Sequence, residues 1–308
     1  MKHKTRGAAL ATAALVALIA LFGMTGCPNN AGGGGTPQAS LVSGGASLIL
    51  SSDKLTIKVT VKTADSSSVT VEGCTETTLT SDSETELHAK GTTVILKGRI
   101  IKLVCSDNRL IALNVQGLSA LEELVCSDNR LTALNVQGLN ALEVLLCGSN
   151  RLTELNVQGL SALKSLGCQG NRLAELNVQG LNVLKLLDCF NNQLTDLKVH
   201  NLSALESLNC QGNQLTSLSV SGCTALKTLN RSSNKIAGKF AVPAFFNSLP
   251  DRLPADDARC YLYTEKAGVS EGNLTNFTGS GVATAFQNAK NRNWKMYKYD
   301  ANGDPVEI

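Results

Sequence analysis

The chain has 308 residues, of which 17% are charged and 43% are hydrophobic, a composition that excludes a wholly disordered protein. Its formal net charge is +3, but Lys2, Lys4 and Arg6 lie in a segment that we predict to be removed, which leaves 28 − 3 = 25 bases against 25 acids. This balance argues against a nucleic-acid-binding surface, and three histidines leave little capacity for general-base catalysis.

The N-terminus, residues 1–26, is typical of a signal peptide. A basic start precedes an uninterrupted apolar run over 8–22, which is too short to span a bilayer comfortably. The run leads into the sequence MTGC at 24–27, which resembles the processing box of bacterial lipoproteins, with methionine where leucine is usual. The resemblance implies cleavage before Cys27 and lipid on its sulfur. We therefore expect an exported protein that is lipid-anchored to the bacterial cell envelope, at its outer surface.

Two segments separate this anchor from the repeats. Residues 27–40 are rich in Gly, Asn, Pro and Ser, which predicts a flexible tether. Residues 41–97 follow as an N-terminal cap. Apolar and polar residues alternate from Leu55 to Lys62, which predicts a half-buried strand, and 69–71 and 94–96 predict two more.

The strongest signal is a repeat with a period of 21 residues over 98–238. Cysteines recur at this spacing, and an asparagine follows each of them by three residues. The cysteines are Cys105, Cys126, Cys147, Cys168, Cys189 and Cys210, and the asparagines run from Asn108 to Asn234 in seven units. The unit at 121–141 reads LEELVCSDNRLTALNVQGLNA, which resembles the leucine-rich repeat LxxLxLxxNxL, with Cys126 in the third leucine position.

The resemblance implies an α/β-type solenoid that is β-dominated, with seven coils, a parallel β-sheet face and a cap at each end. The residue pattern supports this fold independently. Apolar and polar residues alternate around Leu124 and Cys126 as in a short strand, and one unit cannot bury its apolar face without neighbours. Asn129 lies where the chain leaves the strand, and its amide can both donate and accept, so a column of asparagines could satisfy backbone groups between coils.

The cysteine column has three interpretations. Disulfides between neighbouring coils need Cβ atoms about 3.8 Å apart, whereas in-register strands hold them about 4.8 Å apart. A metal site needs ligands that converge, and a straight column does not converge. We therefore expect buried, unreactive thiols.

Arg231 takes the place of cysteine in the seventh unit. We expect the regular core to close there, because an apolar interior would not accept the charge. Outside the column, Cys74, Cys223 and Cys260 remain, and an exported chain could join two of them in a disulfide. The sequence does not indicate which two.

A C-terminal cap of mixed α and β structure is predicted at 239–308. Pro243 can begin a short helix that reaches Leu249, 283–290 is a second helix candidate, and 261–263 and 294–297 are typical of strands. Asn302-Gly303 favours a hairpin turn over a calcium loop, because an EF-hand loop needs glycine at its sixth position and an acid at its twelfth.

The segments 263–273 and 292–297 resemble a tail of leucine-rich repeat lipoproteins from treponemes and related surface proteins. In that family the implied role is surface adhesion or partner binding.

Four stacked arginines and one phenylalanine are the candidate partner-binding residues. The arginines, here called the arginine stripe, are Arg109, Arg130, Arg151 and Arg172. Asp107 and Asp128 can neutralise the first two. No acid stands beside the other two, which could contact a carboxylate or phosphate, or could serve only solubility. Phe190 is the one aromatic residue expected to point outward, where it could anchor a partner or pack on Leu186.

Outward residues vary from coil to coil on a fixed scaffold, which is typical of a binding surface. The sequence therefore favours a non-catalytic, surface-displayed protein-binding module, an adhesin or attachment lipoprotein. Its expected partner is a protein or other surface macromolecule of host or bacterial origin, and its only expected membrane contact is lipid on Cys27. A periplasmic envelope scaffold is the alternative.

We predict no catalytic residue, cofactor or metal, and a monomer. His3 would be removed, His200 is expected to face solvent, and no nucleophile motif lies near His88. Serine-hydrolase, P-loop and zinc-protease motifs are absent from the sequence.

Overall fold

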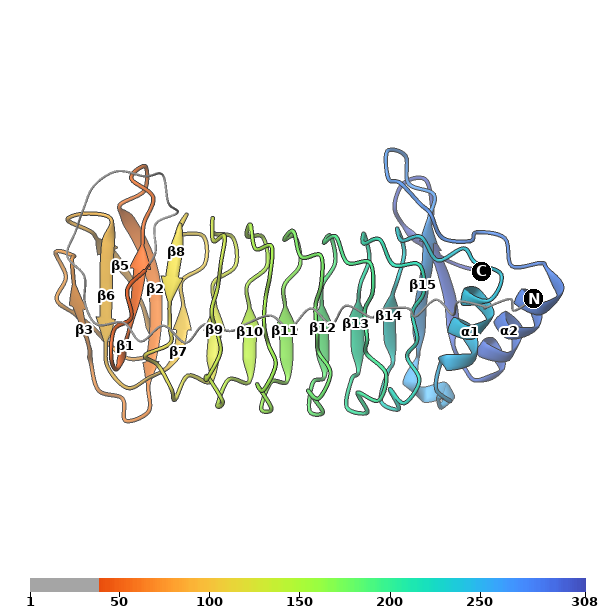
Figure 1. The fold of residues 1–308 in the computed structure, drawn as a ribbon, viewed down its shortest axis with the longest axis horizontal. Helices are drawn as coiled ribbons and strands as arrows, with labels where there is room; N and C mark the ends of the chain where they lie inside the picture. Colours follow the sequence, from red (N-terminus) through yellow and green to blue (C-terminus); the bar gives the residue numbers. More distant parts are fainter. Residues whose placement is uncertain (1–38) are drawn as a thin grey trace, which may run out of the picture. The chain divides into compact units, whose positions relative to one another are not determined.

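The computed structural model describes residues 39–308. The predicted signal peptide, Cys27 and most of the predicted tether therefore lie outside the described residues. The described part has the predicted fold class, a β-dominated leucine-rich repeat solenoid with a cap at each end (Figure 1). None of the helices in this part is long and apolar enough to cross a membrane.

Six strands form the N-terminal cap. They are β1 (Gly45–Ile49), β2 (Thr56–Thr63), β3 (Val69–Glu72), β4 (Thr78–Leu79), β5 (Ser83–His88) and β6 (Thr93–Lys97). In β2, Ile57, Val59 and Val61 are buried and Lys58 and Lys62 are exposed, which confirms the predicted half-buried strand, whereas Leu55 lies outside the strand and is exposed. β3 and β6 were also predicted, whereas β1, β4 and β5 were not.

This cap is joined to the first coil on two sides. β2 pairs antiparallel with β7 (Ile100–Val104), and β1 pairs antiparallel with β8 (Ala112–Asn114) on the return path of the same coil. Backbone hydrogen bonds thus continue from the cap into both sides of the solenoid. The apolar end of the repeat core is covered at the N-terminus.

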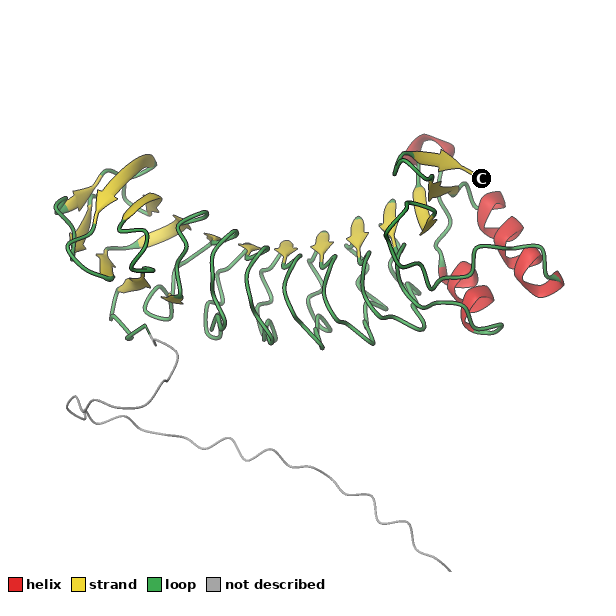
Figure 2. Cartoon of the chain, turned by 90° about the horizontal axis from the view of Figure 1, so that it is seen from above, coloured by secondary structure: helices red, strands yellow, loops and turns green. Residues whose placement is uncertain are grey.

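Each later coil contributes one short parallel strand. These are β9 (Glu123–Val125), β10 (Val144–Leu146), β11 (Ser165–Gly167), β12 (Leu186–Asp188), β13 (Ser207–Asn209) and β14 (Thr228–Asn230). Their central leucines are aligned and buried, and the residues on either side are mostly half-exposed. Figure 2 shows these strands along one side of the solenoid and the return loops along the other.

The predicted asparagine column is confirmed. Asn171 donates from Nδ2 to the carbonyls of Cys147 and Cys168, at 3.1 and 3.0 Å, and accepts from the Leu152 amide at 2.9 Å. Each of these asparagines therefore joins two coils through backbone groups that would otherwise be buried without partners. At the N-terminal end, Asn108 exchanges two such bonds with Lys58 of β2, of 2.9 and 2.7 Å.

The cysteines are free, buried thiols, as expected for a column of small apolar side chains. All nine cysteines within 39–308 are free and buried, including Cys74, Cys223 and Cys260. Burial raises the pKa of Cys105 and of Cys147 to about 12. The thiols are therefore uncharged at neutral pH.

The expectation that the regular core closes at Arg231 was wrong. Arg231 is fully buried, and the sheet continues past it through β15 (Arg259–Thr264) and β16 (Lys295–Tyr299), both parallel to β14. The core accepts the charge because the guanidinium lies 4.4 Å from the centroid of the Phe245 ring, whose face attracts a cation.

The C-terminal cap contains α1 (Ala241–Ser248), a 3₁₀ turn at Pro254–Asp256, α2 (Ser280–Asn291) and β17 (Pro305–Glu307). Both predicted helices, both predicted strands and the hairpin are present. Asp300 forms the hairpin turn by accepting from the amides of Asn302, Gly303 and Asp304 at 2.9, 3.0 and 2.9 Å.

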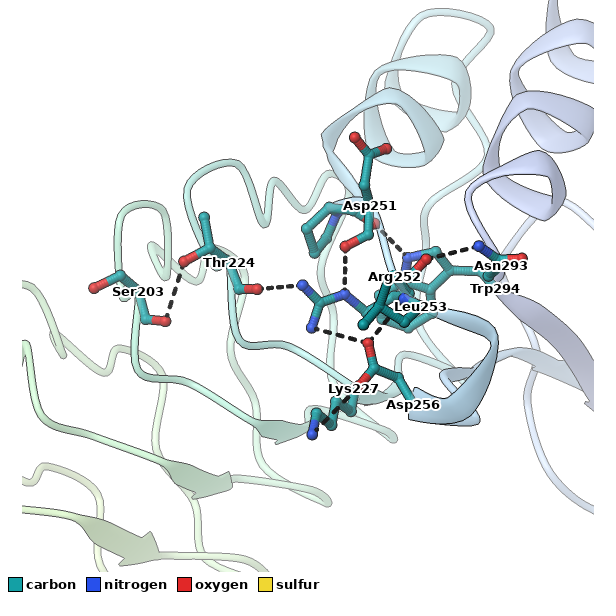
Figure 3. Close-up of polar contacts among 10 residues, drawn as sticks. Ser203, Thr224, Lys227, Asp251, Arg252, Leu253, Asp256, Asn293 and Trp294 are labelled. Atoms are coloured by element: carbon teal, nitrogen blue, oxygen red, sulfur yellow. Dashed lines mark hydrogen bonds and ion pairs between the residues drawn. The ribbon is translucent and has the colours of Figure 1, made fainter.

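Arg252 fastens this cap to the last coil (Figure 3). Its side chain donates to the Thr224 carbonyl and pairs with Asp256, while the Asn293 side chain donates to the Arg252 carbonyl at 2.7 Å. The indole of Trp294 is buried beside them and donates to the Pro250 carbonyl at 2.8 Å. The cap therefore holds a fixed position relative to the sheet.

Candidate functional site

The outward side chains of β7 and β9–β15 form one continuous surface, here called the strand face. They lie in two rows, because each strand presents the residues before and after its buried centre. One row contains Lys102, Glu123, Val144, Ser165, Leu186, Ser207, Thr228 and Arg259. The other contains Val104, Val125, Leu146, Gly167, Asp188, Asn209, Asn230 and Tyr261.

A cavity of about 460 Å³ lies in the C-terminal half of the strand face. Leu146 and Leu186 contribute apolar walls, Asp188 contributes a carboxylate, and Tyr261 and Tyr299 close the end next to the cap. Leu186 is 49% exposed, a high fraction for a leucine on a rigid sheet.

Glycine helps to keep this cavity open. Gly167 lines it, and a Cβ atom at that position would lie 2.9 Å from the Leu146 side chain. At Gly148, in the preceding coil, a Cβ atom would lie 2.4 Å from the amide of Gln169, another lining residue. Side chains at either position would displace residues that shape the cavity.

Tyr261 and Tyr299 form the wall on the cap side, and Tyr297 stacks on Tyr261 without lining the cavity. The Tyr261 ring lies 5.2 Å from that of Tyr297 and 5.3 Å from that of Tyr299. A register shift in the pairing of β15 with β16, between Tyr261 and Tyr263, accompanies this arrangement. The Tyr299 hydroxyl lies 3.3 Å from Nδ2 of Asn230, which also donates to Gln211 at 2.9 Å.

A second cavity of about 700 Å³ also borders Tyr299. It is lined by amide and hydroxyl side chains of the last coils, such as Gln211 and Ser233, and by the cap loop at 266–270. Glu271 fixes this loop, because its carboxylate accepts from the amides of Ser233 and Thr264 at 2.8 and 2.7 Å. Tyr299 is therefore shared by an aromatic–apolar cavity and a polar one.

The arginine stripe is divided in the structure. Arg109 and Arg130 each lie 3.1 Å from Asp53 of the N-terminal cap. The expectation that Asp107 and Asp128 neutralise them was wrong, because the cap brings Asp53 between the two guanidinium groups. The Ser51 hydroxyl and Arg130 lower the pKa of Asp53 to about 2.

Arg151 and Arg172, the other half of the arginine stripe, have no such acidic partner in the described part of the chain. Both are exposed. Phe190 is half-buried, and its amide donates to Asp188 at 3.4 Å. Phe190 and the stripe both lie outside the cavity lining, and Phe190 is linked to it through its backbone amide and Asp188.

The histidines do not form a reactive cluster. His88 is exposed and pairs with Glu76 at 2.8 Å and Glu86 at 3.5 Å, and His200 is exposed as expected. Within the described residues, no group of three or more His, Cys, Asp or Glu side chains could hold a metal ion.

Sequence reasoning missed Asp188, the tyrosine wall and both cavities. Asp188 occupies an outward position of its repeat, so its place on the strand face and its uncharged neighbours, Gly167 and Asn209, followed from the period. The alignment of the three tyrosines requires Tyr261 to pair with Tyr297, which lie in segments far apart in the sequence and outside the 21-residue period.

No protein-family model matches the chain, and no curated protein does. Among solved structures, the functional domain of InlJ from Listeria monocytogenes, which includes a cysteine ladder, is 25% identical with a TM-score of 0.39, over 53% of this chain and 39% of that chain. A leucine-rich repeat protein of Leptospira interrogans is 27% identical with a TM-score of 0.39, over 47% of this chain and 37% of that chain.

An internalin, InlF, from Listeria monocytogenes is 19% identical with a TM-score of 0.37, over 54% of this chain and 49% of that chain. The present chain thus spans less than half the length of each of these proteins. These structural neighbours include leucine-rich repeat proteins, the repeat type that the 21-residue unit resembles.

Proposed function

We propose that this protein is a non-catalytic binding module that holds a protein partner on its strand face, displayed at the bacterial cell surface as an adhesin or attachment lipoprotein. The observation that carries the proposal is the cavity beside Leu186. A half-exposed leucine, a carboxylate and a tyrosine wall surround it, on a sheet whose backbone is fixed by the asparagine column.

Such a surface suits a partner interface for a physical reason. Binding energy concentrates in a few anchors that enter desolvated pockets, and tyrosine is enriched among those anchors. A rigid scaffold adds to affinity because little conformational entropy is lost when it binds. Arg151 and Arg172, which have no ion-pair partner in the described part, are proposed as a secondary contact for carboxylate or phosphate groups.

Display at the surface rests on the sequence alone. The signal peptide, the lipoprotein-like box at 24–27 and the Gly-rich tether support an anchored and exported chain, with lipid on Cys27. The resemblance of 263–273 and 292–297 to treponeme-type surface lipoproteins supports the same location.

The binding role is tested with two matched substitutions three residues apart. Leu186 and Val183 are 49% and 41% exposed, but only Leu186 lies on the strand face. The full chain carrying Leu186→Arg or Val183→Arg is compared with wild type in quantitative capture of host-surface and bacterial-surface proteins. We expect Leu186→Arg to abolish capture of the specific partner and Val183→Arg to retain it. Equal capture by all three proteins would contradict the proposal.

A further inference from the structure

Four charged side chains point outward on the strand face, and three of them have an opposite charge beside them. Lys102 and Glu123 pair with each other at 3.2 Å. Arg259 pairs with Asp257 of the C-terminal cap. The fourth charged side chain, that of Asp188, forms no ion pair with any residue in 39–308.

The neighbours of Asp188 are neutral. β11 presents Ser165 and Gly167 beside it, and β13 presents Ser207 and Asn209. The Phe190 amide donates to the carboxylate at 3.4 Å, a long and weak hydrogen bond, and a hydrogen bond from the Asn209 side chain also lowers the pKa of this carboxyl group. Both partners are neutral, so the half-buried carboxylate has no opposite charge beside it, which is costly unless a ligand supplies one.

The cavity around Asp188 is long and shallow. Its lining residues come from β10 through β16, which at a strand spacing of about 4.8 Å corresponds to a length of about 29 Å. Its volume of about 460 Å³ over that length suits one extended chain better than a compact ligand. Leu186 lies two residues before Asp188 on the same strand, Leu146 lies two strands away beyond Gly167, and Tyr261 and Tyr299 lie toward the cap.

We infer that Asp188 determines specificity by binding an arginine or lysine side chain of an extended segment of the partner protein. The hydrocarbon stem of such a side chain can pack on Leu186 while its charged end reaches the carboxylate. An arginine can in addition form a bidentate pair with the carboxylate. This inference rests on the proposed function, because it names the chemistry of the partner at the same surface.

The probe for this inference is a library of random dodecapeptides displayed on phage and selected on the full chain. Enriched peptides are synthesised, and their Kd values are measured for wild type, Asp188→Asn and Asp196→Asn. Asp196 belongs to the same coil but lies off the strand face and pairs with Lys198, so its variant is the matched control. Each peptide is also made with citrulline, which has the shape of arginine without the charge, in place of its arginine.

We expect the enriched peptides to carry a basic residue next to an apolar one. Asp188→Asn should weaken their binding at least tenfold, and Asp196→Asn should leave it unchanged. Citrulline should weaken binding to wild type to a similar degree, without a further loss in Asp188→Asn. Coupled losses of this kind identify a direct contact between the two charges.

Three results would overturn the inference: no enriched peptide, enriched peptides without a basic residue, or equal Kd values for wild type and Asp188→Asn. Peptides whose binding is weakened by Leu186→Arg but not by Asp188→Asn would contradict this inference and still support the proposed function. Peptides that bind Leu186→Arg as well as wild type would count against the strand face itself. A glycan array is probed in parallel, and saccharides that Asp188→Asn retains and Tyr299→Ala loses would identify a carbohydrate site instead.

Discussion

The guanidinium group of Arg231 lies over the aromatic ring of Phe245, with 4.4 Å between the guanidinium carbon and the ring centroid. Arg231 is fully buried, and none of its three side-chain nitrogens has a hydrogen-bond partner in the described part of the chain. Burial lowers the pKa of Arg231 from its ordinary value. The C-terminal cap therefore covers a charge whose main compensation is one aromatic face.

Replacing this charge should stabilise the protein. Arg231→Met keeps an unbranched but shorter side chain and removes a buried, unpaired cation, so we expect the free energy of unfolding to rise by about 1–4 kcal/mol. Arg172→Met, at an exposed position, is the control and should change it by less than about 0.5 kcal/mol. Urea unfolding measures both, and a loss of stability in Arg231→Met would show that the cation–π contact outweighs the cost of burial.

The asparagine column predicts a large effect from a small substitution. Asn171→Ala leaves the Leu152 amide and the carbonyls of Cys147 and Cys168 without this side chain, which should cost about 1–3 kcal/mol or more. Asn182→Ala, at an exposed position of the same coil, should be close to neutral. Equal midpoints of unfolding for the two variants would argue against the column as a source of stability.

The cysteine column predicts slow thiol chemistry. Burial raises the pKa values of its thiols, those of Cys105 and Cys147 to about 12, so the reactive thiolate is scarce at pH 8. In a Cys27→Ser chain, Ellman's reagent should react with almost none of the nine described cysteines before denaturation and with all nine after it. Fast reaction of several thiols in the native protein would contradict their burial.

Asp188 should make stability depend on pH in an unusual direction. Burial raises the pKa of Asp188 above its model-peptide value of 3.8. Between the two pKa values the folded protein holds a proton that the unfolded chain has released, so stability falls as pH rises through that window. The groups on the adjacent strands do not titrate there, and the nearby thiols of Cys168 and Cys189 stay protonated.

Asp188→Asn should therefore have a higher Tm than wild type at pH 7, and the difference should disappear below the ordinary carboxyl pKa. Tm values measured across this pH range, with Asp196→Asn as the control, test the sign. A lower Tm for Asp188→Asn at pH 7 would mean that the carboxylate already has a stabilising partner.

The divided arginine stripe predicts an unequal response to mutation. Replacing Arg151 and Arg172 together with alanine should weaken partner binding and reduce its dependence on salt, because these two have no ion-pair partner in residues 39–308. Partner binding is measured at two salt concentrations. Unchanged binding at low salt would leave the stripe with a role in solubility alone.

The repeat region was predictable because each coil contacts only its neighbours. The 21-residue period therefore placed the strands, the asparagine column and the buried cysteines directly. The caps were less predictable, because their decisive contacts join distant residues. Asp53 meets Arg109 across 56 residues, and Asn273 reaches the Arg231 carbonyl across 42 residues, which adds a further asparagine to the column outside the period.

The candidate site was more predictable than the caps and less predictable than the repeats. Phe190 and Leu186 could be assigned to one coil from the period, and both lie there. The uncharged neighbours of Asp188, Gly167 and Asn209, could also be assigned, because each lies 21 residues from it. By contrast, Arg231 looked incompatible with the core because Phe245, which covers it, follows the last repeat.

Protease shaving of intact cells tests the central claim most directly, since a binding module for outside partners must be reachable from outside. The repeat body is followed with an antibody, and a periplasmic protein serves as the control for leakage. Loss of the repeat body while the control survives is the result that we predict. Full protection in intact cells, with digestion only after lysis, would contradict surface display and favour the periplasmic envelope scaffold.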